Sequence, residues 1–69
     1  MEQIIARDKA TGTKLFKVRD KVFAVQKGST RKVFGNINKA TDIFLFASNK
    51  FNIKAKNRLN KQLKKKYGF

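Results

Sequence analysis

The most prominent chemical feature of this sequence is its positive charge. The 69 residues include 18 Lys and Arg against four Asp and Glu, which gives a formal net charge of +14. Like charges at this density repel one another and destabilise a compact state, whereas a domain needs a net charge of only about 2 to 8 to stay soluble. Duplex nucleic acid offers one negative charge per about 1.7 Å of its axis. The charge balance therefore predicts a polyanionic partner, nucleic acid.

The side chains that most often catalyse reactions or hold metals are missing. The chain has no His and no Cys, which removes the commonest general base and the thiolate ligands of zinc sites. The four acids, Glu2, Asp8, Asp20 and Asp42, are scattered and form no obvious catalytic pair. We therefore expect a protein that is not an enzyme and that has no cofactor, no metal site and no small-molecule substrate.

The C-terminal run KAKNRLNKQLKKKYGF is the first candidate for phosphate contacts. Residues 51–69 hold seven bases and no acid, whereas residues 1–50 hold eleven bases and four acids. Such bases displace counterions from a phosphate backbone. The candidate contacts are Lys54, Lys56, Arg58, Lys61, Lys64, Lys65 and Lys66. A solvated tail is the alternative. An amphipathic helix on an anionic membrane is disfavoured, because Asn and Gln interrupt its thin apolar stripe.

A sheet surface is the second candidate. If Phe16, Val18 and Val33 point inward, an outward set of side chains lies on the opposite face. We expect that set to contain Lys17, Arg19, Lys32, Phe34 and Asn36, with Arg31 beside it. Lys and Arg can hold phosphates, Arg can read guanine and Asn can read adenine, and an exposed Phe can stack on an unpaired base. The alternative is a solvated face whose charges prevent edge-to-edge aggregation.

Strand and turn signals in the first half of the chain position this surface. The turns are predicted at Gly12, at Asp20-Lys21 and, most clearly, at Gly28-Ser29 between two strand-like runs. The strands are predicted at Lys14–Arg19, Val22–Gln26 and Thr30–Ile37, and Gln3–Arg7 is apolar enough for a short fourth strand. The inward residues of this sheet are predicted to be Phe16, Val18, Val25, Val33 and Ile37.

The apolar period then changes to that of a helix. A stripe at i, i+3, i+4, i+7 and i+11 contains Ala40, Ile43, Phe44, Ala47 and Phe51. Asn38 is the predicted N-cap and Asp42 is placed near the first turn, while Leu45 and Phe46 fall outside the stripe. A second stripe contains Ala55, Leu59, Leu63 and Tyr67, with Gly68 as a predicted helix end. The fold class is therefore α+β: a sheet-plus-helix domain over residues 1–51 and a basic helix or tail over residues 52–69.

Residues 14–51, in the order strand, turn, strand, turn, strand, helix, resemble the AP2-type fold of plant AP2/ERF domains and of the arm-type DNA-binding domains of tyrosine-recombinase integrases. The closest local match is VFGNINKATDIFLFA, Val33–Ala47, which is similar to the family's third-strand end and Ala-containing helix. The resemblance implies a sheet that enters the major groove of duplex DNA, with Lys17, Arg19 and Lys32 at DNA-contacting positions. The Trp residues typical of the plant domains are absent.

These observations together predict a nucleic-acid-binding protein with duplex DNA favoured over RNA. Its size and basicity suit a phage- or plasmid-encoded regulator of transcription, or a nucleoid-associated protein, in the cytoplasm. The longest apolar run, Ile43–Ala47, is too short for a membrane span. One alternative is an RNA- or ribosome-associated protein in which Phe34 and Tyr67 stack on unpaired bases. Another is an inhibitor or adaptor that docks on an acidic protein through Leu45, Phe46 and the sheet edge.

Overall fold

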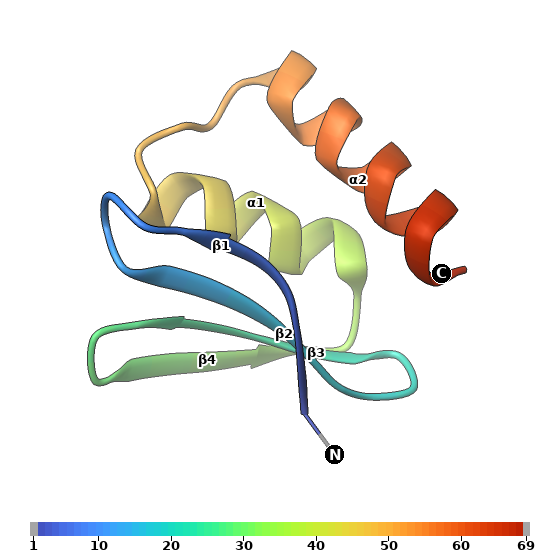
Figure 1. The fold of residues 1–69 in the computed structure, drawn as a ribbon, viewed down its shortest axis with the longest axis horizontal. Helices are drawn as coiled ribbons and strands as arrows, with labels where there is room; N and C mark the ends of the chain where they lie inside the picture. The colour runs from blue at the N-terminus through green and yellow to red at the C-terminus, as the bar shows by residue number, and fades with distance from the viewer. Residues whose placement is uncertain (1, 69) are drawn as a thin grey trace.

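Four antiparallel strands are followed by two helices in the computed structural model, which describes residues 2–68 (Figure 1). The elements are β1 (Gln3–Asp8), β2 (Thr13–Arg19), β3 (Val22–Lys27), β4 (Thr30–Phe34), α1 (Ile37–Ala47) and α2 (Ile53–Tyr67). Each strand pairs with the next one in sequence, so the sheet order is β1-β2-β3-β4. The predicted α+β class is confirmed. The N-terminal segment is a full strand of the sheet, and most of the basic C-terminal segment is a helix.

Short turns fix the register of the central strands, because turn length determines which residues face each other across a hairpin. Lys27 pairs with Thr30 across Gly28-Ser29, and Gly28 has a φ of 60°. That confirms the strongest turn prediction. Between β2 and β3, Lys21 has a φ of 60°, a left-handed conformation that costs a non-glycine residue about 1–2 kcal/mol.

The sequence predicted the wrong inward face for β2. In the structure, the strand register directs the opposite face toward the core. Leu15 pairs with Val25 and is fully buried, and Lys17 pairs with the buried Phe23. Phe16 therefore lies on the face that no helix covers. The prediction that Phe16 points inward is wrong for this reason, although Val25 is buried and Ile37 packs against the core as expected.

Strand β4 is inverted in the same way. Val33 pairs with Ala24 and has 62% of its surface exposed, whereas Lys32 and Phe34 pair with Val25 and Phe23. Residues paired directly across a sheet project to the same face, so Lys32 and Phe34 point to the covered side. The strand also ends at Phe34 instead of continuing to Ile37.

Helix α1 covers the inner face of the sheet with the predicted stripe. Ala40 and Phe44 are buried, and Ile43 packs against the same core. The helix begins two residues earlier than expected, because the Asn36 side chain accepts hydrogen bonds from the Asn38 and Lys39 amides and so forms the N-cap. No acid lies in its first turn.

The first helix also ends earlier than its stripe suggests. It stops at Ala47, with Ser48 as the C-cap and Asn49 at a φ of 59°. Phe51 therefore lies beyond the helix. Of the two residues outside the stripe, Leu45 is buried and Phe46 is exposed.

Helix α2 packs on α1 and completes the core. Leu63 is buried, and Ala55, Leu59 and Tyr67 pack around it, as the second stripe predicted. Asn52 caps the helix at its start through the Ala55 amide, and Gly68 ends it with a φ of 73°. The view in Figure 1 shows α1 between the sheet and α2.

Polar contacts join the two helices as well. The Asn60 side-chain amide oxygen accepts a hydrogen bond from the Thr41 hydroxyl at 2.8 Å, and the Lys56 ammonium lies 2.9 Å from an Asp42 carboxylate oxygen. Asp42 is thus paired with α2 and does not stabilise the start of α1 through the helix dipole. These contacts hold α2 at a defined position on α1.

Candidate nucleic-acid interface

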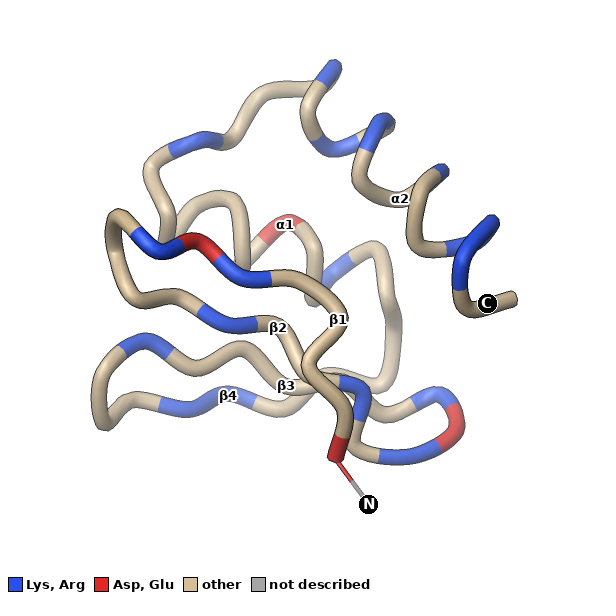
Figure 2. Tube along the Cα trace, viewed as in Figure 1, with Lys and Arg blue, Asp and Glu red and all other residues tan. Residues whose placement is uncertain are grey.

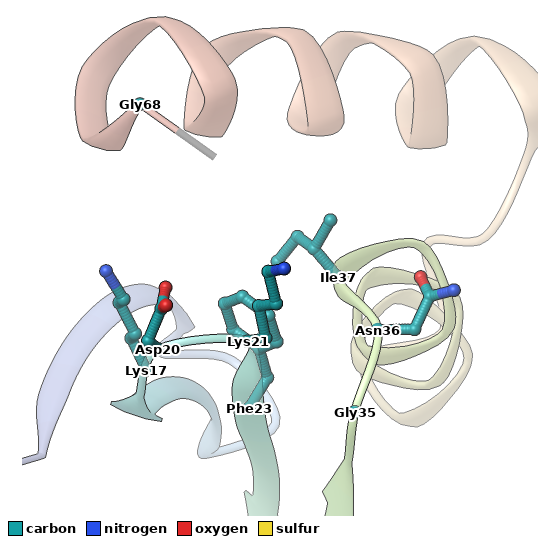
Figure 3. A pocket seen from close by; sticks show the side chains of 8 residues that line it. All are labelled: Lys17, Asp20, Lys21, Phe23, Gly35, Asn36, Ile37 and Gly68. Atoms are coloured by element: carbon teal, nitrogen blue, oxygen red, sulfur yellow. The ribbon is translucent and has the colours of Figure 1, made fainter.

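The sheet residues predicted to contact nucleic acid do not share one face. Lys17 lies on the covered side, where it lines a hollow with Phe23 and Ile37 (Figure 3). Lys32 lines a second hollow on that side with Val25 and Ile43. The expectation that these bases point outward together is wrong, because Leu15, not Phe16, faces the core.

Three other predicted residues have different positions. Phe34 packs against the core, and Asn36 has its side-chain oxygen engaged as the cap of α1. Arg19 is exposed at the end of β2, next to a register shift between Lys17 and Arg19. Of the candidates from the sheet, only Arg31 lies clearly on the uncovered face.

A row of basic side chains crosses all four strands on that uncovered face. Arg7 pairs with Lys14, Lys14 with Gln26, and Gln26 with Arg31. Lys14 lies between Thr13 and Leu15, which are both fully buried, so its own side chain points away from the core. Strands lie about 4.8 Å apart, so the row is about 14 Å long. We call Arg7, Lys14, Gln26 and Arg31 the basic row.

An apolar row runs beside the basic row. It consists of Ile4, Phe16, Ala24 and Val33, which pair in that order across the four strands. Ile4 is 42% exposed and Val33 is 62% exposed. The Arg31 guanidinium lies over the Phe16 ring at 5.2 Å from its centroid and forms an ion pair with Glu2. The two rows together form the surface that we call the open face.

Two of the three bases of the basic row, Arg7 and Lys14, repel each other in the fold, whereas Arg31 is paired with Glu2. Arg7 and Lys14 are directly opposite each other, and like charges in such positions are destabilising by up to about 1 kcal/mol. Within residues 2–68, no acid forms an ion pair with Arg7 or Lys14. Charges that are unfavourable in the protein alone become favourable when an anion lies against them.

Helix α2 carries a second basic surface. Lys54, Arg58, Lys61 and Lys65 recur at i, i+4, i+7 and i+11 and are all exposed, so they form one line on the helix side opposite Leu63. Eleven residues of helix make that line about 16 Å long. Figure 2 shows basic positions along the whole length of α2 and no acidic position on it. We call these four residues the α2 ridge.

The remaining bases of α2 are placed differently. Lys56 is partly buried and paired with Asp42, so its charge is used inside the fold. Lys64 lines a hollow with Asn38 and Asn60 between the two helices, and Lys61 of the α2 ridge lines it as well. Lys66 lies 5.6 Å from the centroid of the Tyr67 ring. The seven predicted bases of the C-terminal segment thus include four that form a single outward line.

Sequence reasoning missed Arg7 and Lys14. Both residues lie within predicted strands, Gln3–Arg7 and Lys14–Arg19. Because the wrong face of β2 was predicted to point inward, Lys14 was not assigned to the same exposed surface as Arg7. The pairing of Asp8 with Thr13 across the Gly12 turn brings Arg7 opposite Lys14. The signal that would have found them is the fully buried pair of Thr13 and Leu15, which only the three-dimensional packing reveals.

Asp8 has a structural role close to this surface. Its carboxylate is 7% exposed and accepts hydrogen bonds from the Lys50 ammonium and the Thr11 hydroxyl, each at 2.8 Å. The Lys50 hydrogen bond, followed by that of Thr11, holds the pKa of Asp8 below its ordinary value of 3.8. The contact ties the end of β1 to the segment between the helices.

No group of three or more His, Cys, Asp or Glu residues within residues 2–68 could hold a metal ion. Among the helices of the same residues, none has the length and apolar character needed to cross a membrane. The features that remain are the two basic surfaces.

Comparisons of this chain with known protein families, with curated proteins and with solved structures found no significant match.

Proposed function

We propose that this protein binds nucleic acid, with duplex DNA as the preferred partner. The observation that carries the proposal is the basic row, a line of three bases and one amide across a sheet face that no helix covers. Arg7 and Lys14 in this line face each other without an acidic partner within residues 2–68, and a phosphate backbone would neutralise them. The α2 ridge adds a second line of bases of similar length.

The open face has the dimensions of a groove-binding surface. The major groove of B-DNA is about 12 Å wide and admits a two-stranded β-ribbon, so the central strands β2 and β3 can enter while β1 and β4 follow the rims. In that position Arg7 and Arg31, on the outer strands, contact phosphates. Gln26, on a central strand, can accept from and donate to an adenine edge.

The apolar row supplies a second kind of contact. Val33 is largely exposed next to the basic row, and an aliphatic side chain in the groove contacts thymine methyl groups. The ion pair between Glu2 and Arg31 lies on the same face. A DNA phosphate can take the place of the Glu2 carboxylate as the partner of Arg31.

Titration of a mixed-sequence duplex at several salt concentrations tests the proposal. We expect log affinity to fall linearly with log salt, with a slope of about −0.9 for each phosphate neutralised. An Arg7→Ala/Lys14→Ala variant should lose about 1.8 from that slope. The matched control is Lys9→Ala/Lys39→Ala, which removes the same charge from exposed positions outside both surfaces. Equal loss in the two variants would show that net charge, and not the basic row, determines affinity.

A competition experiment distinguishes RNA from duplex DNA as the preferred partner. Structured RNA and duplex DNA compete at equal salt, and a preference for RNA would overturn the choice of partner while leaving the basic row as the binding surface. Tyr67 packs against the core and is half-buried, and Phe34 is also partly buried. Neither of the two rings is therefore well placed for the base stacking that the sequence suggested.

A docking site for an acidic protein is a second candidate, and one observation favours it. The rings of Phe46 and Phe51 stack at 4.2 Å between centroids, and Phe46 is 59% and Ile53 is 72% exposed. Lys54 follows directly, so an apolar patch borders a positive one. A Phe46→Ser/Ile53→Ser variant that binds duplex DNA normally but loses a stoichiometric protein complex would support this function instead.

A further inference from the structure

The open face and the α2 ridge lie on opposite sides of the molecule. Helix α1 packs on the inner face of the sheet, and α2 packs on α1 through Leu59 and Leu63. The ridge residues are on the helix side opposite Leu63, and of the four Lys61 also lines the hollow that α2 shares with α1. In Figure 2 the start of α2 lies across α1 from the strands, whereas Lys21, in the β2–β3 turn, shares a hollow with Gly68 at the end of α2 (Figure 3).

One straight duplex cannot touch both surfaces. The molecule measures 28 × 27 × 18 Å, so a duplex in contact with both would have to turn through about half a circle around it. That turn takes about 20 base pairs, or about 90° per ten base pairs, against about 45° per ten base pairs in the nucleosome. Three or four bases on each side do not approach the number of contacts that hold nucleosomal DNA in its curve.

We propose that one molecule of this protein bridges two duplex segments, one held by the open face and the other by the α2 ridge. The inference rests on the proposed function and deepens it from binding to bridging. Two separate segments account for the observation that the molecule has bases on two sides, with like charges adjacent on each. In the α2 ridge, neighbours at i+3 and i+4 are all basic, an arrangement that destabilises an isolated helix.

The charge of the whole molecule fits this arrangement. The net charge of +14 exceeds what either surface alone presents to a polyanion. Two duplexes held side by side repel each other, and a strongly positive body between them screens that repulsion. Because the salt slope is proportional to the number of phosphates neutralised, each surface should hold its duplex more weakly and with a shallower slope than a protein with about 6–10 contacts on one duplex.

A capture assay tests the inference. A duplex is tethered to beads, the protein is added at low salt, and recovery of a second, labelled duplex of unrelated sequence is measured. The full chain is compared with Arg7→Ala/Lys14→Ala, with Arg58→Ala/Lys61→Ala and with the Lys9→Ala/Lys39→Ala control. All four are used at concentrations that give equal occupancy of a single duplex, so that weaker binding alone does not reduce recovery.

We expect the unmodified protein and the control to recover the labelled duplex. Each surface variant should bind one duplex and recover at least tenfold less of the second one. All six substituted positions are exposed, and circular dichroism checks that each variant is folded.

Three outcomes would overturn the inference in distinguishable ways. If the unmodified protein binds the tethered duplex but recovers no label, bridging is wrong and the proposed function stands. If it does not bind the tethered duplex at low salt, the proposed function itself fails. If either surface variant recovers as much label as the unmodified protein, bridging occurs through dimers or net charge, and the two-surface arrangement is wrong.

Discussion

The open face and the α2 ridge carry comparable positive charge but are built in different ways. Each base of the ridge lies one turn of the same helix from the next, so the line exists wherever residues 53–67 are helical. The basic row takes one residue from each of four strands, and its members are up to 24 positions apart in sequence. The ridge is thus a local property of the chain, whereas the row depends on the register of the whole sheet.

That difference has a consequence for binding. A line of bases on one helix contacts phosphates without regard to sequence, because it presents only charge. The open face also presents an amide and apolar side chains, which can contact base edges. We therefore expect the ridge to supply affinity and the open face to supply any sequence preference. The predictions below separate the two surfaces, starting with the largest effect.

Truncation of the core should remove the open face and leave the charge of the ridge. Leu15 is fully buried between the sheet and α1, and Leu15→Ala should reduce the free energy of unfolding by about 2–5 kcal/mol. For a domain of this size, that is most of its stability. Thermal unfolding followed by circular dichroism measures the effect.

The control for this change is Val33→Ala, which truncates an exposed residue of the same sheet and should alter stability by less than about 0.5 kcal/mol. Leu15→Ala should retain weak, salt-dependent duplex binding, because the bases of residues 53–67 need no sheet. Complete loss of that binding would show that the ridge also depends on the tertiary structure.

The two faces of the sheet should respond differently to the loss of two bases. Arg7→Ala/Lys14→Ala removes bases from the open face and should lower duplex affinity by about 60-fold at 0.1 M salt, from a slope change of about 1.8. Lys17→Ala/Lys32→Ala removes two bases from the covered side and should change the slope by less than half as much. A larger effect of the second variant would contradict the assignment of the open face as the interface.

Acidification should loosen the attachment of β1 to the segment between the helices. The pKa of Asp8 is lowered by its hydrogen bonds from Lys50 and Thr11, so the carboxylate stabilises the fold at pH values above its unfolded pKa, about 3.9. That contribution disappears as the pH falls through the lower folded pKa. Asp8→Asn should therefore be less stable at pH 7 and should lose less stability between about pH 4 and pH 2. Parallel stability curves for the two proteins would exclude this role.

Lys56 and Lys61 should separate stability from binding within α2. The Lys56 ammonium pairs with Asp42, and both side chains are about 30% exposed, so Lys56→Ala should destabilise the fold by at most about 1 kcal/mol. Lys61→Ala should leave stability almost unchanged and reduce the salt slope by about 0.9. Urea unfolding and duplex titration of both variants measure the two effects. A reversed pattern would place Lys56 in the interface.

The smallest expected effect is a gain in stability. Arg7→Ala removes one of two like charges that face each other across β1 and β2, and it should stabilise the fold at low salt by a few tenths of a kcal/mol. The same variant should bind duplex DNA more weakly. High salt should remove the stability gain, because exposed charges are screened over about a Debye length. Destabilisation by Arg7→Ala would indicate that the guanidinium has a structural partner.

The amino-acid sequence by itself determined the elements that depend on short-range patterns. Gly28-Ser29 marked the β3–β4 turn, the Ala40–Ala47 stripe marked α1, and the Ala55–Tyr67 stripe marked α2 and left its bases outward. A helix presents residues at i, i+4 and i+7 to one side whatever else the chain does. The α+β class and the ridge were therefore predictable.

Only the tertiary structure decided which face of the sheet is open. Lys14–Arg19 has apolar residues on both faces, so its alternation does not choose between Leu15 and Phe16. The choice depends on Val25 and Phe23 across a tight turn, and on a register shift near Arg19. A shift of one residue moves every side chain of a strand to the other face. For that reason the sequence identified the charge of this protein, and the fold determined that Arg7, Lys14 and Arg31 present it together.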